Sequence, residues 1–219
     1  MTLVSAHRCL TSEDIESAIA LGADYVEIDV QRTADGSLVL HHDPVDVPSL
    51  ELLRYDEALG LIAGRARVHL DLKFHGHEVE AVALAVERLG TDHMLVTTGH
   101  DDGVRSVRDW ADASGHHLMV GLSLGRGVPG FALWQLLKVR ASEIWPEVRY
   151  GHARANVAVA HHWLARIRVA RFARRHRLPL LVWTVDTPRS LAYWMRPGRA
   201  WMVTTNEPAL ALRLRADRI

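Results

Sequence analysis

Apolar and polar residues alternate most clearly in one segment of the chain, residues 22–44. Apolar side chains at positions 26, 28 and 30 alternate there with Glu27 and Asp29, which predicts a β-strand with both carboxylates on one face. A turn at Asp35-Gly36 leads into the segment SLVLHHDP, which carries a His-Asp pair. Two adjacent carboxylates repel each other unless a cation lies between them, and a hard divalent cation bound through oxygen is the usual partner.

The rest of the chain alternates between strand-like and helix-like patterns. Further strands are predicted at residues 2–9, 67–74, 93–98, 116–124, 156–160, 178–185 and 200–205. Helical spacing of apolar positions predicts helices at residues 11–21, 49–63, 78–89, 101–113, 131–142, 163–176, 189–195 and 207–216. The segment from residue 144 to residue 154 shows no clear pattern.

Strands that alternate with helices imply a parallel sheet with right-handed crossovers. About eight such units in 219 residues predict an α/β fold, namely a compact (β/α)8 TIM barrel formed by a single domain, residues 1–219. An open, doubly wound sheet is the competing fold, and it would place its site at one switch point. A barrel would instead bring the polar residues late in each strand to one rim. Those residues are His7, Glu27, Asp29, Asp71, Lys73 and Thr184.

Charge and cysteine content narrow the function classes. Lys plus Arg and Asp plus Glu number 26 each, so the chain as a whole has no attraction to nucleic acid. Cys9 has no partner for an intrachain disulfide, and no secretory leader precedes the first strand, so a cytoplasmic location is predicted. The helix containing Arg166–Arg177 is strongly basic. It is either the charged outer face of a barrel helix or a peripheral contact with anionic lipid headgroups.

Six short segments, taken in order, carry a resemblance to a known family. They are AHR, GADYVEIDV, T-x-DGSLVLHHDP, VHLDLK, VWTVD and TTNEP. Together they resemble the glycerophosphodiester phosphodiesterase family, and the resemblance touches nearly every predicted strand. It implies a TIM barrel and a metal-dependent enzyme that hydrolyses glycerophosphodiesters to glycerol phosphate and an alcohol.

The resemblance also implies a role for each of eight side chains. They are the acid–base pair His7 and His42, the metal ligands Glu27, Asp29 and Asp71, the phosphate contacts Arg8 and Lys73, and the pocket residue Trp183. Oxygen ligands suit Ca²⁺ and Mg²⁺ equally, so the metal stays open. The order in which the two histidines act is open as well, and so is the oligomeric state.

Several alternatives remain beside this prediction. Cys9 stands where the family has glycine after His7 and Arg8, and the family's arginine- and threonine-rich tail after the His42-Asp43 motif is missing, so a catalytically silent barrel that binds phosphate-bearing ligands is one alternative. Asp71 also stands where glutamate is common. A lysophospholipase D that acts on lysophospholipids is another. The segment His75–His77 could contribute to a zinc site, although the spacing supplies no further ligands. Cys9 is expected to be a small buried residue, and a nucleophilic role for it would require a neighbouring base.

Overall fold

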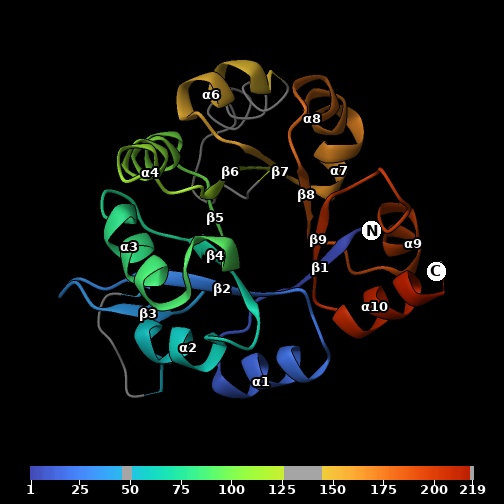
Figure 1. Cartoon of the computed structure of the whole chain (residues 1–219). Coiled ribbons are helices and arrows are strands. Elements are labelled where there is room, and N and C mark those ends of the chain that lie inside the picture. The colour runs from blue at the N-terminus through green and yellow to red at the C-terminus, as the bar shows by residue number, and fades with distance from the viewer. Residues whose placement is uncertain (46–50, 126–144, 218–219) are drawn as a thin grey trace.

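A closed barrel of parallel strands surrounded by helices forms the structure (Figure 1). The computed structural model describes residues 1–45, 51–125 and 145–217. Within these residues eight strands run parallel and close through the β1–β2 pairing, so the predicted TIM barrel is confirmed and the open sheet is wrong. The strands are β1 (Leu3–Ala6), β2 (Tyr25–Arg32), β4 (Arg67–Leu72), β5 (Met94–Thr98), β6 (Met119–Leu124), β7 (Val157–His161), β8 (Leu180–Trp183) and β9 (Met202–Thr205).

A short additional strand, β3 (Leu38–Leu40), pairs antiparallel with β2. Gly36, with φ of 89°, supplies the left-handed backbone conformation that the connecting turn requires. The hairpin places His41 and His42 beside the C-terminal half of β2, and the His41 amide donates to the carbonyl of Asp29. The predicted turn at Asp35-Gly36 and the segment SLVLHHDP that follows it therefore form a hairpin with β2 on the barrel rim.

The outer layer consists of the helices that follow the strands. They are α1 (Ser12–Ala20), α2 (Tyr55–Ile62), α3 (Glu78–Leu89), α4 (Asp101–Ala113), α6 (Pro146–Ala153), α7 (His162–Leu164), α8 (Ala170–His176), α9 (Pro188–Trp194) and α10 (Pro208–Ala216), with a short 3₁₀ turn η1 (Thr91–His93) and a π-helical segment η2 (Ala165–Val169). Thr11 caps α1 in a capping box with Asp14, as the sequence indicates. No helix in the described ranges is both long and apolar enough to cross a membrane.

The main differences from the predicted elements lie at their ends. The helix expected from residue 49 begins at Tyr55 in the described residues, because Arg54 instead bridges to Val39 of β3. Residues 146–153, which show no clear pattern in the sequence, form α6 with proline at its first position. The helix predicted at 131–142 lies outside the described residues. Several strands are also shorter than predicted, so that His7, Arg8 and Lys73 lie just beyond β1 and β4.

Alternation along the strands divides the buried residues into two sets. On β2 the even positions Val26, Ile28 and Val30 pack outward against the helices and are fully buried in the main core. The odd positions point into the barrel, where a second, smaller apolar cluster fills part of the lumen. Its buried members are Tyr25, Leu95, Val157, Val159, Leu181 and Met202. Beyond this apolar cluster, toward the C-terminal ends of the strands, the inward-facing residues are polar, and they form the candidate site.

Candidate active site

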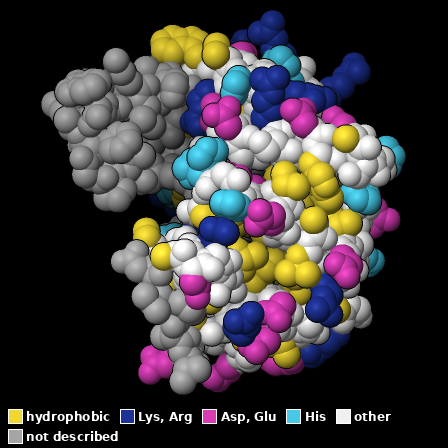
Figure 2. Space-filling view, turned by 90° about the vertical axis from the view of Figure 1, so that its left-hand side faces the viewer, with side chains coloured by type: hydrophobic (Ala, Val, Ile, Leu, Met, Phe, Trp, Pro, Cys, Tyr) yellow, Lys and Arg dark blue, Asp and Glu magenta, His cyan; other side chains and the backbone are white. Residues whose placement is uncertain are grey.

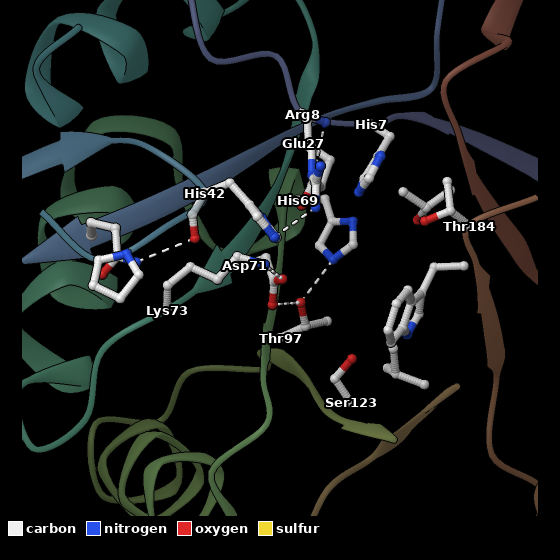
Figure 3. Close-up of a pocket in the computed structure, with 15 residues that line it drawn as sticks. His7, Arg8, Glu27, His42, His69, Asp71, Lys73, Thr97, Ser123 and Thr184 are labelled. Carbon is white, nitrogen blue, oxygen red and sulfur yellow. Dashed lines mark hydrogen bonds and ion pairs between the residues drawn. The ribbon is translucent and has the colours of Figure 1, made fainter. Parts of the chain in front are cut away.

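The register between β2 and β4 brings the predicted acidic residues together. Asp29 pairs with Asp71, and Glu27 pairs with His69 one layer lower. Carboxylate oxygens of Glu27, Asp29 and Asp71 all lie within 4.8 Å of one another, and all three side chains are buried. Figure 3 shows Glu27 and Asp71 facing the same cavity from these strands. The acidic cluster predicted from the sequence therefore exists at the C-terminal rim of the barrel.

Lys73 lies between two of the carboxylates. Its Nζ is 2.9 Å from Asp29 Oδ1 and 2.6 Å from Asp71 Oδ2, and the side chain is 12% exposed. The Arg8 guanidinium also approaches Asp29, with Nε 3.6 Å from Oδ2. Two cationic side chains thus face three carboxylates, and when all of these groups are ionised the cluster has one negative charge in excess.

Glu27 is the most isolated of the three acids. Its Oε2 accepts a hydrogen bond from the backbone amide of Arg8 at 2.5 Å, which helps to hold Arg8 in a left-handed conformation with φ of 55°. Burial raises the pKa of Glu27 well above its usual value, and the neighbouring charges of Asp29 and Asp71 raise it further. An additional cation at this position would reverse that effect by stabilising the ionised form.

The donor set fits a hard divalent cation. Three carboxylates from two adjacent strands converge, and Asp29 Oδ1, although 2.9 Å from the Lys73 ammonium, has no hydrogen-bond partner among the described residues. A divalent ion would change the excess charge of the cluster from one negative to one positive. That excess matches a ligand with a single negative charge.

His42 is held in one tautomer by its two contacts. Its Nδ1 is 2.8 Å from Asp29 Oδ2, and its Nε2 is 2.6 Å from an Nη of Arg8. A carboxylate only accepts and a guanidinium only donates, so Nδ1 carries the proton and Nε2 presents a lone pair. His41, its neighbour, turns away and contacts the carbonyl of Asp43 at 2.8 Å. His42 is therefore the histidine of this pair that faces the site.

His7 is oriented from the opposite end of the sequence. Its Nδ1 lies 2.9 Å from Asn206 Oδ1, and Asn206 Nδ2 in turn donates to Asp186 Oδ2 at 2.7 Å. The contact with Asp186 fixes which end of the amide is the acceptor, so His7 Nδ1 donates and Nε2 is left unprotonated in the neutral ring. Burial lowers the pKa of His7, although its contact with Asn206 and the charge of Asp29 partly oppose this effect.

A cavity of about 440 Å³ connects these groups and opens at the barrel mouth. Its far wall is formed by Ser123, Val159, Trp183 and Thr204, from β6 to β9. Trp183 Nε1 and Thr204 Oγ1 are buried and have no hydrogen-bond partner among the described residues. Trp183, the predicted pocket residue, is part of this wall.

A chain of hydrogen bonds below the acidic cluster is missing from the sequence prediction. Thr97 Oγ1 donates to Asp71 Oδ1 at 2.8 Å and lies 3.0 Å from His69 Nε2, while His69 Nδ1 lies 3.2 Å from Ser5 Oγ. Burial lowers the pKa of His69 to about 4, so the ring is neutral and donates from Nε2 to Thr97. His69 stands two residues before Asp71 in the strand pattern, and that spacing alone could have indicated its inward direction.

Asn206 and Asp186 are also missing from the predicted site. Both occur in the segments VWTVD and TTNEP, at the ends of the last two predicted strands. Because parallel strands end at the same rim, this placement is the signal that could have identified them.

Two further sequence hypotheses fail against the structure. His75 and His77 contact different carboxylates, Glu78 at 2.9 Å and Glu80 at 3.0 Å, and neither belongs to a group of converging ligands in the described part of the chain. Cys9 is 4% exposed, and burial raises its pKa to about 12. A thiol of that kind is a poor nucleophile at neutral pH. The expectation that Cys9 is a small buried residue is confirmed.

Comparison with known proteins supports the predicted resemblance. Residues 9–51 match the model of the Glycerophosphoryl diester phosphodiesterase family, a stretch that contains Glu27, Asp29 and His42. The predicted resemblance to this family is therefore confirmed over this stretch of the chain. No curated protein matched the chain.

Solved structures extend the likeness to the whole barrel. A glycerophosphodiester phosphodiesterase from Parabacteroides distasonis has 18% identity and a TM-score of 0.73, with 99% of this chain and 98% of that one covered. The corresponding protein from Thermotoga maritima has 16% identity, a TM-score of 0.71, and coverage of 98% and 99%. An Oleispira antarctica phosphodiesterase in complex with the product sn-glycerol-3-phosphate has 19% identity, a TM-score of 0.70, and coverage of 98% and 96%. At these identities the likeness shows the fold.

Proposed function

We propose that this protein is a metal-dependent phosphodiesterase that hydrolyses glycerophosphodiesters to glycerol phosphate and an alcohol. The observation that carries the proposal is one cavity lined both by the cluster of Glu27, Asp29 and Asp71 and by two oriented histidines, His7 and His42. The named product in the Oleispira antarctica structure supports a glycerol phosphate ligand for barrels of this kind.

Charge complementarity explains why a phosphodiester would suit the cavity. A phosphodiester carries one negative charge, which matches the single positive excess of the cluster with a divalent ion bound. When bound, Ca²⁺ or Mg²⁺ would neutralise the phosphate charge and polarise its oxygens, with Glu27, Asp29 and Asp71 as ligands. Arg8 would bind phosphate oxygens through its forked guanidinium, and Lys73 would contribute a point charge.

The two histidines are suited to opposite proton transfers. His7 is kept neutral by burial and presents an unprotonated Nε2, so it is the better base for the proton of the attacking hydroxyl group. His42 donates from Nδ1 to Asp29, and with Arg8 bound to the phosphate its Nε2 would be free to carry a proton to the leaving oxygen. We therefore assign His7 as the base and His42 as the acid.

The direct test is turnover of glycerophosphocholine after treatment with a chelator and readdition of Ca²⁺ or Mg²⁺. We expect activity to disappear on chelation, to return with the metal, and to be absent in Asp29→Asn. A matched control is Asp102→Asn, because Asp102 is an exposed carboxylate on α4, outside the cavity, that contacts His152 at 2.7 Å. Undiminished turnover in the presence of chelator would rule out metal dependence. No turnover with either metal would favour the silent, ligand-binding alternative.

The lysophospholipase D alternative concerns the substrate and not the chemistry. Side-by-side turnover of glycerophosphocholine and lysophosphatidylcholine under the same metal conditions separates the two substrate classes. We expect the water-soluble diester to be hydrolysed; a clear preference for the lysolipid would assign the enzyme to the second class. The predicted cytoplasmic location also remains a proposal, which localisation of a tagged chain would test.

A further inference from the structure

We infer that the outer face of the helix from His162 to Arg177 binds anionic membrane surfaces. Trp163, Ile167, Arg171 and Arg174 follow one another at spacings of four, four and three residues, which places them on one side of a helix. All four are exposed, with Trp163 at 64% and Ile167 at 60%. We call these four residues the basic stripe.

The charge balance of this helix is unlike that of its neighbours. Residues 162–177 contain six arginines and no acidic residue. Arg166 lies over the ring of Tyr193, and Arg168 contacts Glu147 on α6 at 3.5 Å. The other four, Arg171, Arg174, Arg175 and Arg177, form no ion pair within the described residues and are exposed. Their charges therefore have no acidic partner in the described part of the fold.

The apolar end of the stripe indicates a lipid surface and not a nucleic acid. Exposed tryptophan and isoleucine beside arginines are typical of helices that lie in the membrane interface, where the apolar side chains enter the boundary and the cations contact headgroups. Val148 on α6 and Trp145 directly before that helix are exposed as well, at 76% and 59%, and the Glu147–Arg168 contact joins α6 to this helix. Nucleic acid would offer no comparable environment to an exposed isoleucine.

The stripe begins at the mouth of the cavity. The helix starts directly after β7, and the last residue of that strand, His161, packs edge-to-face on Trp183 with ring centroids 5.5 Å apart. Trp163 is two residues further on. A membrane bound through the apolar end of the stripe would therefore lie close to the barrel mouth. This consequence for substrate access rests on the proposed function, whereas the binding itself does not.

Co-sedimentation of the full chain with vesicles tests the binding. We compare pure phosphatidylcholine vesicles with vesicles that contain phosphatidylglycerol, at low and at high salt. A basic residue near an anionic surface contributes about 1 kcal/mol, so we expect Arg171→Ala/Arg174→Ala to bind the anionic vesicles about 25-fold more weakly. The matched control is Arg88→Ala/Arg213→Ala, because both residues are exposed and lie on α3 and α10. It should bind like the wild type.

Tryptophan fluorescence tests whether Trp163 enters the membrane interface. Brominated lipids quench tryptophans that enter the interface, and we expect quenching in the wild type to fall in Trp163→Phe but not in Trp110→Phe on α4. Absence of binding to anionic vesicles at low salt would overturn the inference. Equal weakening by the two double variants, or equal quenching in the two tryptophan variants, would overturn it too.

Kinetics separate this inference from the proposed function. We expect the double variant Arg171→Ala/Arg174→Ala to hydrolyse lysophosphatidylcholine in anionic vesicles more slowly than the wild type. Its hydrolysis of soluble glycerophosphocholine should be unchanged. If neither substrate is hydrolysed, the proposed function fails while vesicle binding still stands on the sedimentation result.

Discussion

The two walls of the cavity differ in kind. The wall at the ends of β1, β2 and β4 and of the β3 hairpin carries three carboxylates, two cationic side chains and the histidines His7 and His42. Short polar contacts join Lys73 to Asp29 and Asp71, and they join His42 to Asp29 and Arg8. The opposite wall, from β6 to β9, carries a serine, a valine, a tryptophan and a threonine, with two buried polar atoms that have no partner among the described residues. Charges on the first wall suit a phosphate, whereas the second suits the uncharged part of a substrate.

The outer surface shows a parallel contrast. On the face that carries β3, α3 and α4, acidic, basic and histidine side chains are intermixed (Figure 2). Acidic residues of α4 are paired with cations of α6 and of the residue that follows it, as Asp101 is with Arg149 and Asp112 with Arg154. The basic stripe on the far side lacks such partners in the described residues. In the cavity and on the outer surface, contacts between opposite charges are consistent with a stabilising role. Polar or charged groups without such a partner among the described residues mark surfaces available to a ligand.

The largest expected effect comes from breaking the charged wall at its histidines. His7→Ala and His42→Ala should each lower kcat by about 10²–10⁴-fold, because each removes a general acid or base. Steady-state kinetics with a chromogenic diester checks this, with circular dichroism to verify folding. His41→Ala is the matched control, since the His41 side chain turns away from the site and contacts the carbonyl of Asp43 in its own loop. Near-normal turnover in either active-site variant would contradict the assignment.

The second prediction concerns stability and the polar chain under the charged wall. The pKa of His69 is about 4 in the fold, below its ordinary value of 6.5, so the unfolded state binds more protons between these pH values. This group should therefore remove about 3 kcal/mol of stability in total as the pH falls to 4, and most of that loss occurs between pH 6.5 and pH 4.

Urea unfolding of the metal-free protein at several pH values checks this. His69→Gln lacks the ionisable ring, so its free energy of unfolding should fall less steeply over the same interval. Parallel pH dependences for the two proteins would show that His69 does not titrate abnormally.

A smaller effect on kcat is expected from the contact between His7 and Asn206, which joins the two walls of the cavity. Asn206→Ala removes the acceptor that fixes the His7 ring, and loss of one such hydrogen bond should lower kcat about tenfold. The ¹⁵N chemical shifts of the His7 ring provide a second readout, since the ring should then mix its tautomers. A single tautomer in the variant would show that Asn206 does not position His7.

The smallest effect should arise on the neutral wall. Trp183→Phe keeps an aromatic ring but shortens a side chain that lines the cavity, so we expect KM to rise about 3- to 10-fold with kcat nearly unchanged. Trp201→Phe is the control, because Trp201 packs on Tyr25 outside this cavity. A change confined to kcat would assign Trp183 to the chemistry and remove the distinction between the walls.

The sequence by itself determined the barrel and the acidic wall. Period-two alternation in β2 and β4 fixes which residues point inward, because a strand presents every second side chain to one face. Glu27, Asp29 and Asp71 could therefore be placed inside before any coordinates were known. The ordered motifs that carry the family resemblance added the two histidines and Lys73.

Only the tertiary structure decided the register and the contacts between distant segments. That Asp29 lies beside Asp71 depends on how two strands align, which alternation does not specify. Asn206 reaches His7 because closure of the barrel pairs β9 with β1, joining residues 199 positions apart. Side-chain periodicity is local and can be read along the chain. The partners of a buried polar group depend on which strands meet, and that is a property of the closed barrel.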